Sequence, residues 1–468
     1  MNRPTNEKLT RRQMLRMIGF GSAGVALAAC GAAVPSAATP APSAAAPTAG
    51  AAAPTAAASA PTAPPATAPA VAAGKVTLTW LSQLPATDKL VAAFNETNPN
   101  IEIKVETAEF RDLFAQNQVR LGSGSSNLDI VEVDAPVMAS YGLRGWLAPL
   151  DDVIGQESIA SWLPALDQSS RYQGKLLTVP LWNSTLMLYY NVSLLEKAGI
   201  TPPAADERWT WEQIADAAKK LTKDENGDGV PDVWGFQFEQ YNRIYQLQPL
   251  PQGLGGKIIG PDGLTVKGII DAPEWVKAFT WYQDLHTKLK VAPQGQIGVY
   301  DLFSTGKLAM TVAGPWNLNG FISAKVPFRT APHPAWKGGE ALVPTDGWHL
   351  GVNAKSKHVP ETLEFIKFAA SPKAGQVLRD AASAWPVHSS LLDAIIKDPS
   401  NKDWPNKAWS VAAEESKHAA GRAVTPGFLE YEEILSDTFE DIRNGAAVQE
   451  ALSSAAARIE GEMQKYRQ

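Results

Sequence analysis

The side chains best suited to chemistry in this sequence are aromatic rings and polar groups placed where predicted strands end. Asp134 ends one predicted strand, and Gln83 and Glu109 follow two others. In open α/β sheets, ligands lie beyond the carboxyl ends of strands. Trp and Tyr rings match the apolar faces of sugar rings, whereas carboxylates, amides and guanidinium groups match hydroxyl groups. These residues indicate a site that holds a small polar molecule.

Catalysis finds little support in the sequence. None of the six histidines lies in an H-E-x-x-H pattern, and neither a G-x-S-x-G elbow nor a G-x-x-x-x-G-K-[ST] loop occurs. The single cysteine, Cys30, excludes disulfide frameworks and cysteine-based metal sites. We therefore predict that the protein is not an enzyme and needs no cofactor. A secreted glycoside hydrolase stays an alternative, with Asp134 and Glu239 as the carboxylate pair to test.

A run of acidic residues and glycines from 224 to 232 matches the first half of a calcium-binding loop. Its metal ligands would be Asp224, Asn226, Asp228 and Asp232, but the twelfth position is Gly235, which has no carboxylate. A tight Asp/Gly turn after a helix explains the same pattern. We expect the turn, with calcium as the weaker alternative.

Residues 1–30 have the pattern of a bacterial export signal. Five basic residues stand against one acidic residue, a net charge of +4, and an uncharged stretch too short to span a bilayer follows. Residues 10–16 resemble the twin-arginine export motif, and residues 27–30 resemble a lipobox in which Cys30 becomes lipid-modified. We expect a lipoprotein signal peptide; an ordinary signal peptide with a chance cysteine is the alternative.

Residues 31–74 predict a disordered linker. They carry no charged and no aromatic residue, and 39 of the 44 are Ala, Pro, Ser or Thr. No core can form from such a composition, and the prolines oppose helix. The linker would hold a globular body away from the membrane.

The remaining residues, 75–468, form that body. The chain has 468 residues and a net charge of −6, so this part carries −6 − 4 = −10 and is a poor nucleic-acid binder. Predicted strands at 76–81, 101–105 and 128–133 alternate with predicted helices at 88–96 and 113–121. This alternation predicts an α/β fold with a parallel sheet. Further helices are expected at 211–221, 272–288, 361–370 and 448–467.

Four passages of this body share their order and spacing with a known family. They are residues 175–180 running into 188–200, residues 209–214, residues 306–316, and residues 351–356 before 361–366. Together they resemble the extracellular solute-binding proteins of ABC importers (family 1), in the branch that includes the maltose-binding protein. The resemblance covers nearly all of residues 75–468.

The resemblance implies an α/β fold of two lobes, of the class II periplasmic-binding-protein type, with a ligand cleft between lobes that hinge segments join. Lobe 1 would comprise 75–183 and 348–385, and lobe 2 would comprise 184–347 and 386–468. It also implies that Trp316, in Gly-Pro-Trp, stacks on a sugar ring. The candidate ligand-binding residues are Trp316, Asp134, Trp182, Tyr241, Trp348, Gln83, Glu109, Asn183, Glu239, Gln240, Trp385 and Arg422.

The function implied by the resemblance is transport. The protein would be lipid-anchored to the outer face of the cell membrane, capture a mono- or oligosaccharide, and deliver it to the permease subunits of an ABC transporter. It would act as a monomer and bind no nucleic acid. The alternative is the same fold with a non-sugar solute: a glycerol phosphodiester, which needs Arg or backbone N–H donors, or a polyamine, which needs several carboxylates.

Overall fold

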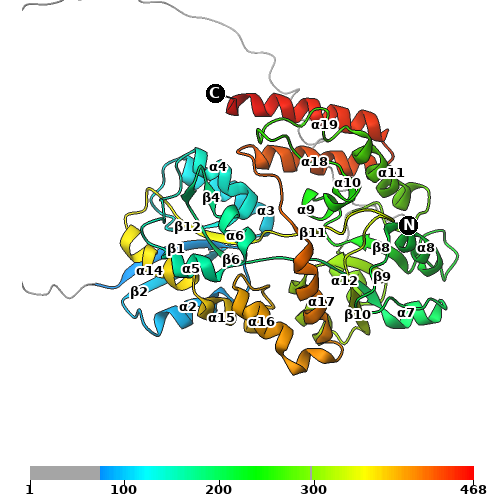
Figure 1. The fold of residues 1–468 in the computed structure, drawn as a ribbon, viewed down its shortest axis with the longest axis horizontal. Helices are drawn as coiled ribbons and strands as arrows, with labels where there is room; N and C mark the ends of the chain where they lie inside the picture. The colour runs from blue at the N-terminus through cyan, green and yellow to red at the C-terminus, as the bar shows by residue number, and fades with distance from the viewer. Residues whose placement is uncertain (1–73, 296–297, 468) are drawn as a thin grey trace, which may run out of the picture. The chain divides into compact units, whose positions relative to one another are not determined.

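The computed structural model describes residues 74–295 and 298–467. The predicted export signal, its Cys30 and nearly all of the predicted linker lie outside the described residues. Figure 1 shows strands in two groups, each covered by helices. No helix in the described ranges is long and apolar enough to cross a membrane.

Five strands form the first sheet, in the spatial order β2, β1, β3, β12, β6. Their bounds are Ile101–Thr107 (β2), Val76–Ser82 (β1), Ile130–Asp134 (β3), Trp348–Val352 (β12) and Val179–Trp182 (β6). β1 is parallel to β2 and to β3, which confirms the parallel arrangement predicted for the first three strands. Helices α2 (Thr87–Asn95) and α3 (Phe110–Gly122) are the crossovers that parallel strands require.

Four strands form the second sheet, in the order β10, β7, β9, β8. Their bounds are Phe328–Ala331 (β10), Met187–Asn191 (β7), Leu308–Ala313 (β9) and Trp234–Phe238 (β8). β7 is antiparallel to both neighbours, and β8 is parallel to β9. The two sheets with their helices are the two lobes of the predicted fold class. The residues at which each lobe begins and ends stay a prediction.

The chain crosses between the two sheets more than once within the described residues. It passes from β6 to β7, and it returns from the short strand β11 (Val343–Pro344) to β12. A third crossing lies near Trp385, whose carbonyl oxygen accepts a hydrogen bond of 3.0 Å from the backbone N–H of Asn183. Beyond it, α17 (Lys407–Glu415) packs against β10 of the second sheet.

The remaining elements surround the two sheets. The helices are α4 (Met138–Leu143), α5 (Gln156–Ser161), α6 (Pro164–Ser169), α7 (Val192–Lys197), α8 (Trp211–Leu221), α9 (Ile244–Leu247), α10 (Pro249–Gln252), α11 (Pro273–Thr287), α12 (Val299–Ser304), α13 (Leu318–Ser323), α14 (Val359–Ala369), α15 (Pro372–Ala382), α16 (Ser389–Lys397), α18 (Phe428–Arg443) and α19 (Val448–Met463). The short strands are β4 (Arg171–Tyr172), β5 (Lys175–Leu176) and β13 (Ala419–Ala420).

Helix α8 shows how local sequence sets an element. The Thr210 hydroxyl accepts the N–H of Gln213 at 3.2 Å, and the Gln213 side chain accepts the N–H of Thr210 at 2.8 Å. This reciprocal pair satisfies two N–H groups at the start of the helix, and such caps are worth about 1 kcal/mol. The helix then buries Trp211, Ile214 and Leu221 on one face.

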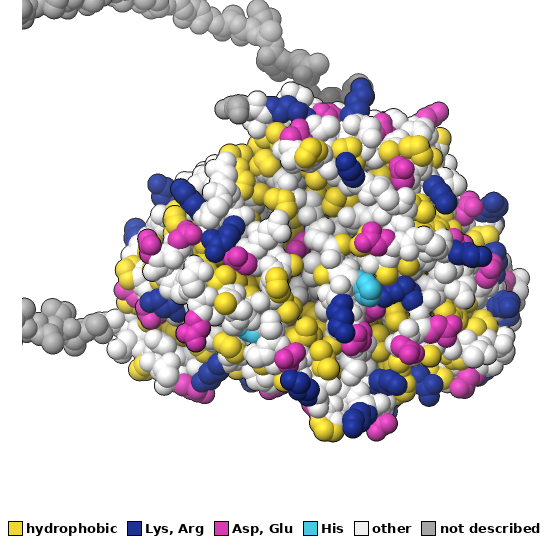
Figure 2. All heavy atoms as spheres, viewed as in Figure 1, with side chains coloured by type: hydrophobic (Ala, Val, Ile, Leu, Met, Phe, Trp, Pro, Cys, Tyr) yellow, Lys and Arg dark blue, Asp and Glu magenta, His cyan; other side chains and the backbone are white. Residues whose placement is uncertain are grey.

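Each sheet packs on apolar side chains. Against the first sheet, Trp80 of β1 and Phe94 of α2 both contact Phe365 of α14, with ring centroids 5.6 and 5.2 Å apart. Against the second sheet, Tyr189 of β7 contacts Phe321 at 5.5 Å. On the face shown in Figure 2, basic and acidic side chains are interspersed over both groups of elements. The aromatic contacts hold the helices against each sheet.

Candidate ligand-binding site

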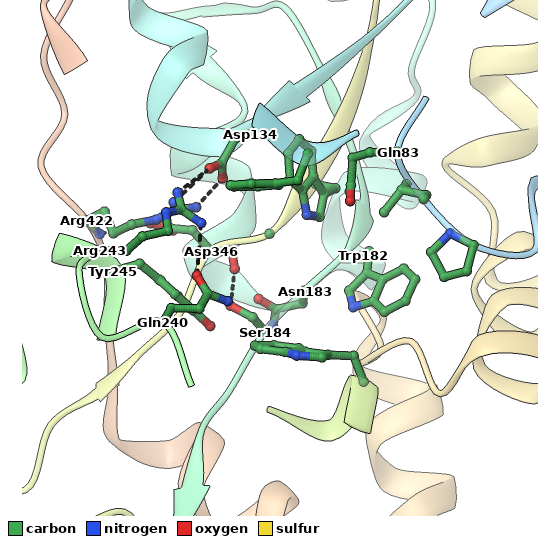
Figure 3. A pocket seen from close by; sticks show the side chains of 16 residues that line it. Gln83, Asp134, Trp182, Asn183, Ser184, Gln240, Arg243, Tyr245, Asp346 and Arg422 are labelled. Carbon is green, nitrogen blue, oxygen red and sulfur yellow. Dashed lines mark hydrogen bonds and ion pairs between the residues drawn. The ribbon is translucent and has the colours of Figure 1, made fainter. Parts of the chain in front are cut away.

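A cavity of about 330 Å³ lies between side chains of the two sheets and of the segments that cross between them. Figure 3 shows these side chains around the cavity. Its lining residues are Gln83, Leu84, Pro85, Phe110, Asp134, Trp182, Asn183, Ser184, Gln240, Arg243, Tyr245, Trp316, Asp346, Gly347, Trp348 and Arg422.

The topology of the first sheet explains why distant residues meet here. β1 and β3 are parallel, so Gln83, just past β1, and Asp134, at the end of β3, lie at the same edge. β12 is antiparallel to both of its neighbours, so its first residue reaches that edge as well. Trp348 is accordingly paired with Asp134 on one side and with Trp182 on the other. This is the strand-end position at which α/β sheets hold ligands.

Aromatic rings form much of the cavity wall. Phe110 and Trp348 meet edge to face, with ring centroids 5.9 Å apart and an interplanar angle of 89°. From the second lobe, Trp316 lies 6.5 Å from Tyr245. Trp182 adds a further ring at the first crossing. Such rings present flat apolar surfaces of the size of a sugar ring.

An ion-pair cluster joins the two lobes at the cavity. Figure 3 shows dashed lines from the Asp134 carboxylate to the neighbouring guanidinium groups of Arg422 and Arg243. Arg422 donates to both carboxylate oxygens, at 2.9 Å to Oδ2 and through a second contact to Oδ1, and Arg243 Nη2 lies 3.4 Å from Oδ2. Arg243 also pairs with Glu432 at 2.7 Å, and Asp346 accepts the backbone N–H of Arg422 at 2.8 Å. Both guanidinium groups are therefore already occupied by carboxylates.

The electrostatics of the cluster follow from burial and pairing. Asp134 is 2% exposed and Arg422 is 6% exposed. Burial opposes the charged form of Asp134, but the two arginines outweigh it and hold the pKa of Asp134 below its usual value. For Asp346, burial is the larger effect and raises the pKa, although Arg422 opposes that shift. The cluster contains three carboxylates against two guanidinium groups, so it carries no excess positive charge.

Two buried polar atoms at the cavity, the Tyr245 hydroxyl and Nε of Arg422, form no hydrogen bond of normal geometry within the described residues. The Tyr245 hydroxyl interacts with the Ser184 side chain, and Nε of Arg422 lies 3.6 Å from the Asp346 carboxylate. A bound molecule with hydroxyl groups would offer both atoms hydrogen bonds of better geometry.

The segment between β11 and β12 has unusual backbone requirements at two adjacent residues, Asp346 and Gly347. A Cβ on Gly347 would lie 1.7 Å from the backbone oxygen of Trp182, so only glycine allows these two crossing segments to approach. Asp346 has a φ of 80°, in the left-handed region that few residues other than glycine adopt. Strained residues of this kind collect at functional sites. The segment thus places the Asp346 carboxylate against the cavity.

The structure brings together eight of the twelve residues predicted for the site. Those that line the cavity are Gln83, Asp134, Trp182, Asn183, Gln240, Trp316, Trp348 and Arg422. The strand-end argument placed Gln83 and Asp134, and the family resemblance placed the other six.

Four predicted residues do not line the cavity. Glu109 is exposed just before α3, and its neighbour Phe110 reaches the cavity in its place. The Tyr241 ring lies 4.6 Å from the Arg443 guanidinium, inside the second lobe. Trp385 is fully buried, stacked 6.0 Å from Trp409, with its indole N–H donating to Ser416 at 3.0 Å.

Glu239, the fourth, lies behind the cavity wall. Its carboxylate accepts hydrogen bonds from the Trp316 indole N–H and from the Asn317 amide, both at 2.8 Å. Both carboxylates of the pair considered for glycoside hydrolysis are bonded to protein groups. Asp134 is ion-paired with arginines, and Glu239 accepts hydrogen bonds from Trp316 and Asn317.

Sequence reasoning missed half of the lining residues. Ser184 and Asp346 lie beside the predicted lobe boundaries at 183/184 and 347/348, and Arg243 and Tyr245 lie just beyond the predicted residues 239–241. Proximity to these predicted positions was the available signal. Nothing in the sequence pattern indicated Phe110 as a lining residue except its position next to Glu109. The others missed are Leu84, Pro85 and Gly347.

The acidic run from 224 to 232 forms a loop that is exposed from 224 to 230. Its side-chain oxygens accept backbone N–H groups: Asp224 from Gly227 at 2.7 Å, Asn226 from Asp228 at 2.8 Å, and Asp228 from Val230 at 2.8 Å. Among the described residues, no group of three or more His, Cys, Asp or Glu side chains is placed to hold a metal ion. The turn thus closes through its own hydrogen bonds.

The two lobes, the crossing segments and the cavity between them define a two-lobed α/β binding protein. The family described as bacterial extracellular solute-binding protein matches residues 79–376, which is more than half of the chain. The chain belongs to this family.

Curated relatives have sequence identities of about a quarter. A probable ABC transporter-binding protein of Deinococcus radiodurans is 26% identical over 54% of this chain, and the match spans 60% of that protein's length. The sn-glycerol-3-phosphate-binding periplasmic protein of Escherichia coli is 25% identical over 65% of this chain and 72% of its own.

Solved structures show the same fold. An ABC substrate-binding protein of Listeria monocytogenes in complex with cycloalternan has a TM-score of 0.74, is 24% identical, and covers 83% of this chain and 98% of its own. A maltose/maltodextrin-binding domain of Bdellovibrio bacteriovorus bound to maltotriose has a TM-score of 0.70 at 22% identity, covering 83% of this chain and 100% of its own. These likenesses establish the architecture.

Proposed function

We propose that this protein captures a neutral carbohydrate in the cavity between its lobes and delivers it to the permease of an ABC importer. The observation that carries the proposal is the wall of aromatic rings around hydrogen-bonding groups, with Trp182, Trp316 and Trp348 beside Asn183 and Gln240. Rings match the C–H faces of sugars, and amides match their hydroxyl groups. The solved relatives described with cycloalternan and maltotriose support this class of solute.

A phosphate ester is the second candidate, because the Escherichia coli relative is described as binding sn-glycerol 3-phosphate. A phosphate is best held by free guanidinium groups. At this cavity, however, Arg422 and Arg243 are both ion-paired with Asp134, and Arg243 is also paired with Glu432. A phosphate would have to displace these carboxylates or lie among them. The charge balance therefore favours an uncharged solute.

A polyamine fits less well for a similar reason. It would need carboxylates free to accept its ammonium groups. Asp134 is held by two arginines, and Asp346 accepts the backbone N–H of Arg422. Catalysis forms no part of the proposal, since the family comprises binding proteins.

The remaining features of the transport proposal rest on the sequence. Residues 1–30 would direct export, Cys30 would carry the lipid, and residues 31–74 would link the anchor to the body. The body would then act as a monomer outside the membrane, with lobe 1 formed by 75–183 and 348–385 and lobe 2 by the other body residues. Mass spectrometry of the membrane fraction tests the anchor, because Cys30→Ser should abolish both the lipid mass and membrane retention.

Thermal unfolding tests the proposed solute. A ligand that binds only the folded state stabilises it, by about 2.7 kcal/mol at 100 times its dissociation constant. We expect maltotriose or another neutral oligosaccharide of a test panel to raise the melting temperature, and sn-glycerol 3-phosphate and spermidine to leave it unchanged. Stabilisation by the phosphate ester alone would establish the second candidate instead.

A further inference from the structure

The Trp316 ring at the cavity is held by a carboxylate that does not itself line the cavity. Glu239 Oε1 accepts the indole N–H of Trp316 at 2.8 Å and the side-chain amide of Asn317 at 2.8 Å. The other oxygen, Oε2, accepts from Gln246 Nε2 at 3.3 Å. Three side-chain donors thus converge on one carboxylate, from the Gly-Pro-Trp turn and from helix α9.

The carboxylate itself is fixed to the second sheet. Glu239 directly follows β8, and its backbone N–H donates to the carbonyl oxygen of Val312 on the neighbouring β9 at 3.1 Å. Its position is therefore set by backbone pairing rather than by a flexible loop. Burial raises the pKa of Glu239, and the hydrogen bonds from Asn317, Trp316 and Gln246 oppose that shift.

The glycine of the Gly-Pro-Trp turn supplies the space for the ring. A Cβ on Gly314 would lie 2.0 Å from a carbon of the Trp316 indole. The φ of Gly314 is −96°, which any residue can adopt, so the requirement is for space and not for backbone conformation. The Tyr189 hydroxyl donates to the carbonyl oxygen of Gly314 at 2.8 Å and holds this turn against β7.

From this geometry we propose that Glu239 is a positioning residue: its carboxylate, together with the space left by Gly314, fixes the rotation of the Trp316 indole before any solute binds. The family resemblance implied instead that Glu239 contacts the solute, but its side chain accepts hydrogen bonds from Trp316, Asn317, Gln246 and the Gly314 backbone, which are all protein groups. A ring already held in its bound orientation loses less conformational freedom on binding, which increases affinity. The identity of the solute rests on the proposed function, whereas the fixed ring does not.

The first experiment uses the whole protein without added solute. Tryptophan is labelled with ¹⁵N in the indole, and Trp316→Phe identifies the resonance of Trp316. In the wild-type protein, we expect this N–H to resonate downfield and to exchange slowly with solvent. A wild-type Trp316 N–H that exchanges as fast as an exposed indole overturns the proposal without any further variant.

Variants of Glu239 then separate positioning from general folding. Glu239→Gln keeps an oxygen acceptor and should retain the slow exchange, whereas Glu239→Ala should accelerate it at least tenfold. Gly314→Ala should displace the ring and give the same result from a different position. Glu157→Ala, an exposed residue on α5, is the matched control and should leave the signal unchanged. An unchanged Trp316 signal in Glu239→Ala would contradict the proposal.

Affinity for maltotriose completes the test. We expect Glu239→Ala to weaken binding at least tenfold and Glu239→Gln to weaken it by less than about threefold. If the wild-type protein binds neither maltotriose nor any other neutral sugar, the proposed function fails, while the indole signal still decides whether Glu239 positions the ring. An unchanged affinity despite a released indole would overturn the link between positioning and solute capture.

Discussion

The two sides of the cavity hold different kinds of side chain for different purposes. On the charged side, Asp134 from the first sheet is paired with Arg243 and Arg422, which reach it from elements of the second lobe. On the aromatic side, Trp316 uses its indole N–H within the protein and leaves its ring surface for the cavity. Charged residues that line a cavity can therefore be bonded to one another and not to a ligand, as Asp134, Arg243 and Arg422 are.

Breaking the charged side should have the largest effect on stability. Asp134→Ala leaves Arg422 buried without its main partner, and such a loss costs about 3–5 kcal/mol. We expect this decrease in the free energy of unfolding, measured by urea denaturation. Glu157→Ala, at an exposed position, should change it by less than about 0.5 kcal/mol. A loss below about 1 kcal/mol for Asp134→Ala would show that the pair does not hold the lobes.

A second carboxyl group on the same strand sharpens the comparison. Glu132 is 1% exposed, has no arginine beside it, and burial raises its pKa from 4.5 to about 7 despite its hydrogen bond with Ser82. Between these two values, the folded chain keeps a proton that the unfolded chain has released. Stability should therefore fall as the pH rises from about 4.5 to 7, by about 3 kcal/mol from this group.

Glu132→Gln provides the measurement of that pH effect. The variant lacks the titrating group, so its free energy of unfolding relative to the wild type should rise across this pH window and level off above it. Urea denaturation at several pH values measures the difference. A difference that stays constant with pH would contradict the assignment of a raised pKa to Glu132.

Breaking the aromatic side should affect binding more than folding. Trp316→Ala removes a ring that lines the cavity, and such anchors contribute on the order of 1–3 kcal/mol to binding. We expect this loss of affinity in calorimetric titration with the most stabilising oligosaccharide. Trp409→Ala is the matched control, since this partly buried ring stacks on Trp385 away from the cavity. Equal affinity of the Trp316 variant and the wild type would remove the ring from the site.

The smallest effect is expected at Tyr245, which lies between the two sides. Its buried hydroxyl forms no hydrogen bond of normal geometry among the described residues and only interacts with the Ser184 side chain, so Tyr245→Phe should change the stability of the solute-free protein by less than about 1 kcal/mol. Solute affinity should fall by about 1 kcal/mol, the contribution of one hydrogen bond. Lower stability without a change in affinity would show that the hydroxyl serves the fold.

Much of the fold could be predicted from the sequence, because its signals are local. The strands predicted at 76–81 and 101–105 correspond to β1 and β2, and the helix predicted at 211–221 corresponds to α8. The pairing of β12 between β3 and β6 could not be read from periodicity, since it joins segments more than 150 residues apart. That part of the architecture came from the family resemblance.

The site was predictable only where topology fixes position. The ends of the predicted strands single out Gln83 and Asp134, and both line the cavity because parallel neighbours end at one edge. Glu109, predicted on the same ground, is exposed, and its neighbour Phe110 lines the cavity. Trp385 and Glu239 do not line the cavity because of their partners. Trp385 stacks on Trp409, and Glu239 accepts a hydrogen bond from Trp316. Such partners lie far apart in sequence and leave no pattern.

The most direct test of the account is a crystal structure of the protein with the most stabilising neutral oligosaccharide. We expect a sugar ring on the face of Trp316, a sugar hydroxyl bonded to Tyr245, and an intact ion pair between Asp134 and Arg422. A ligand bound instead to guanidinium groups released from Asp134, or bound away from the cavity, would contradict it.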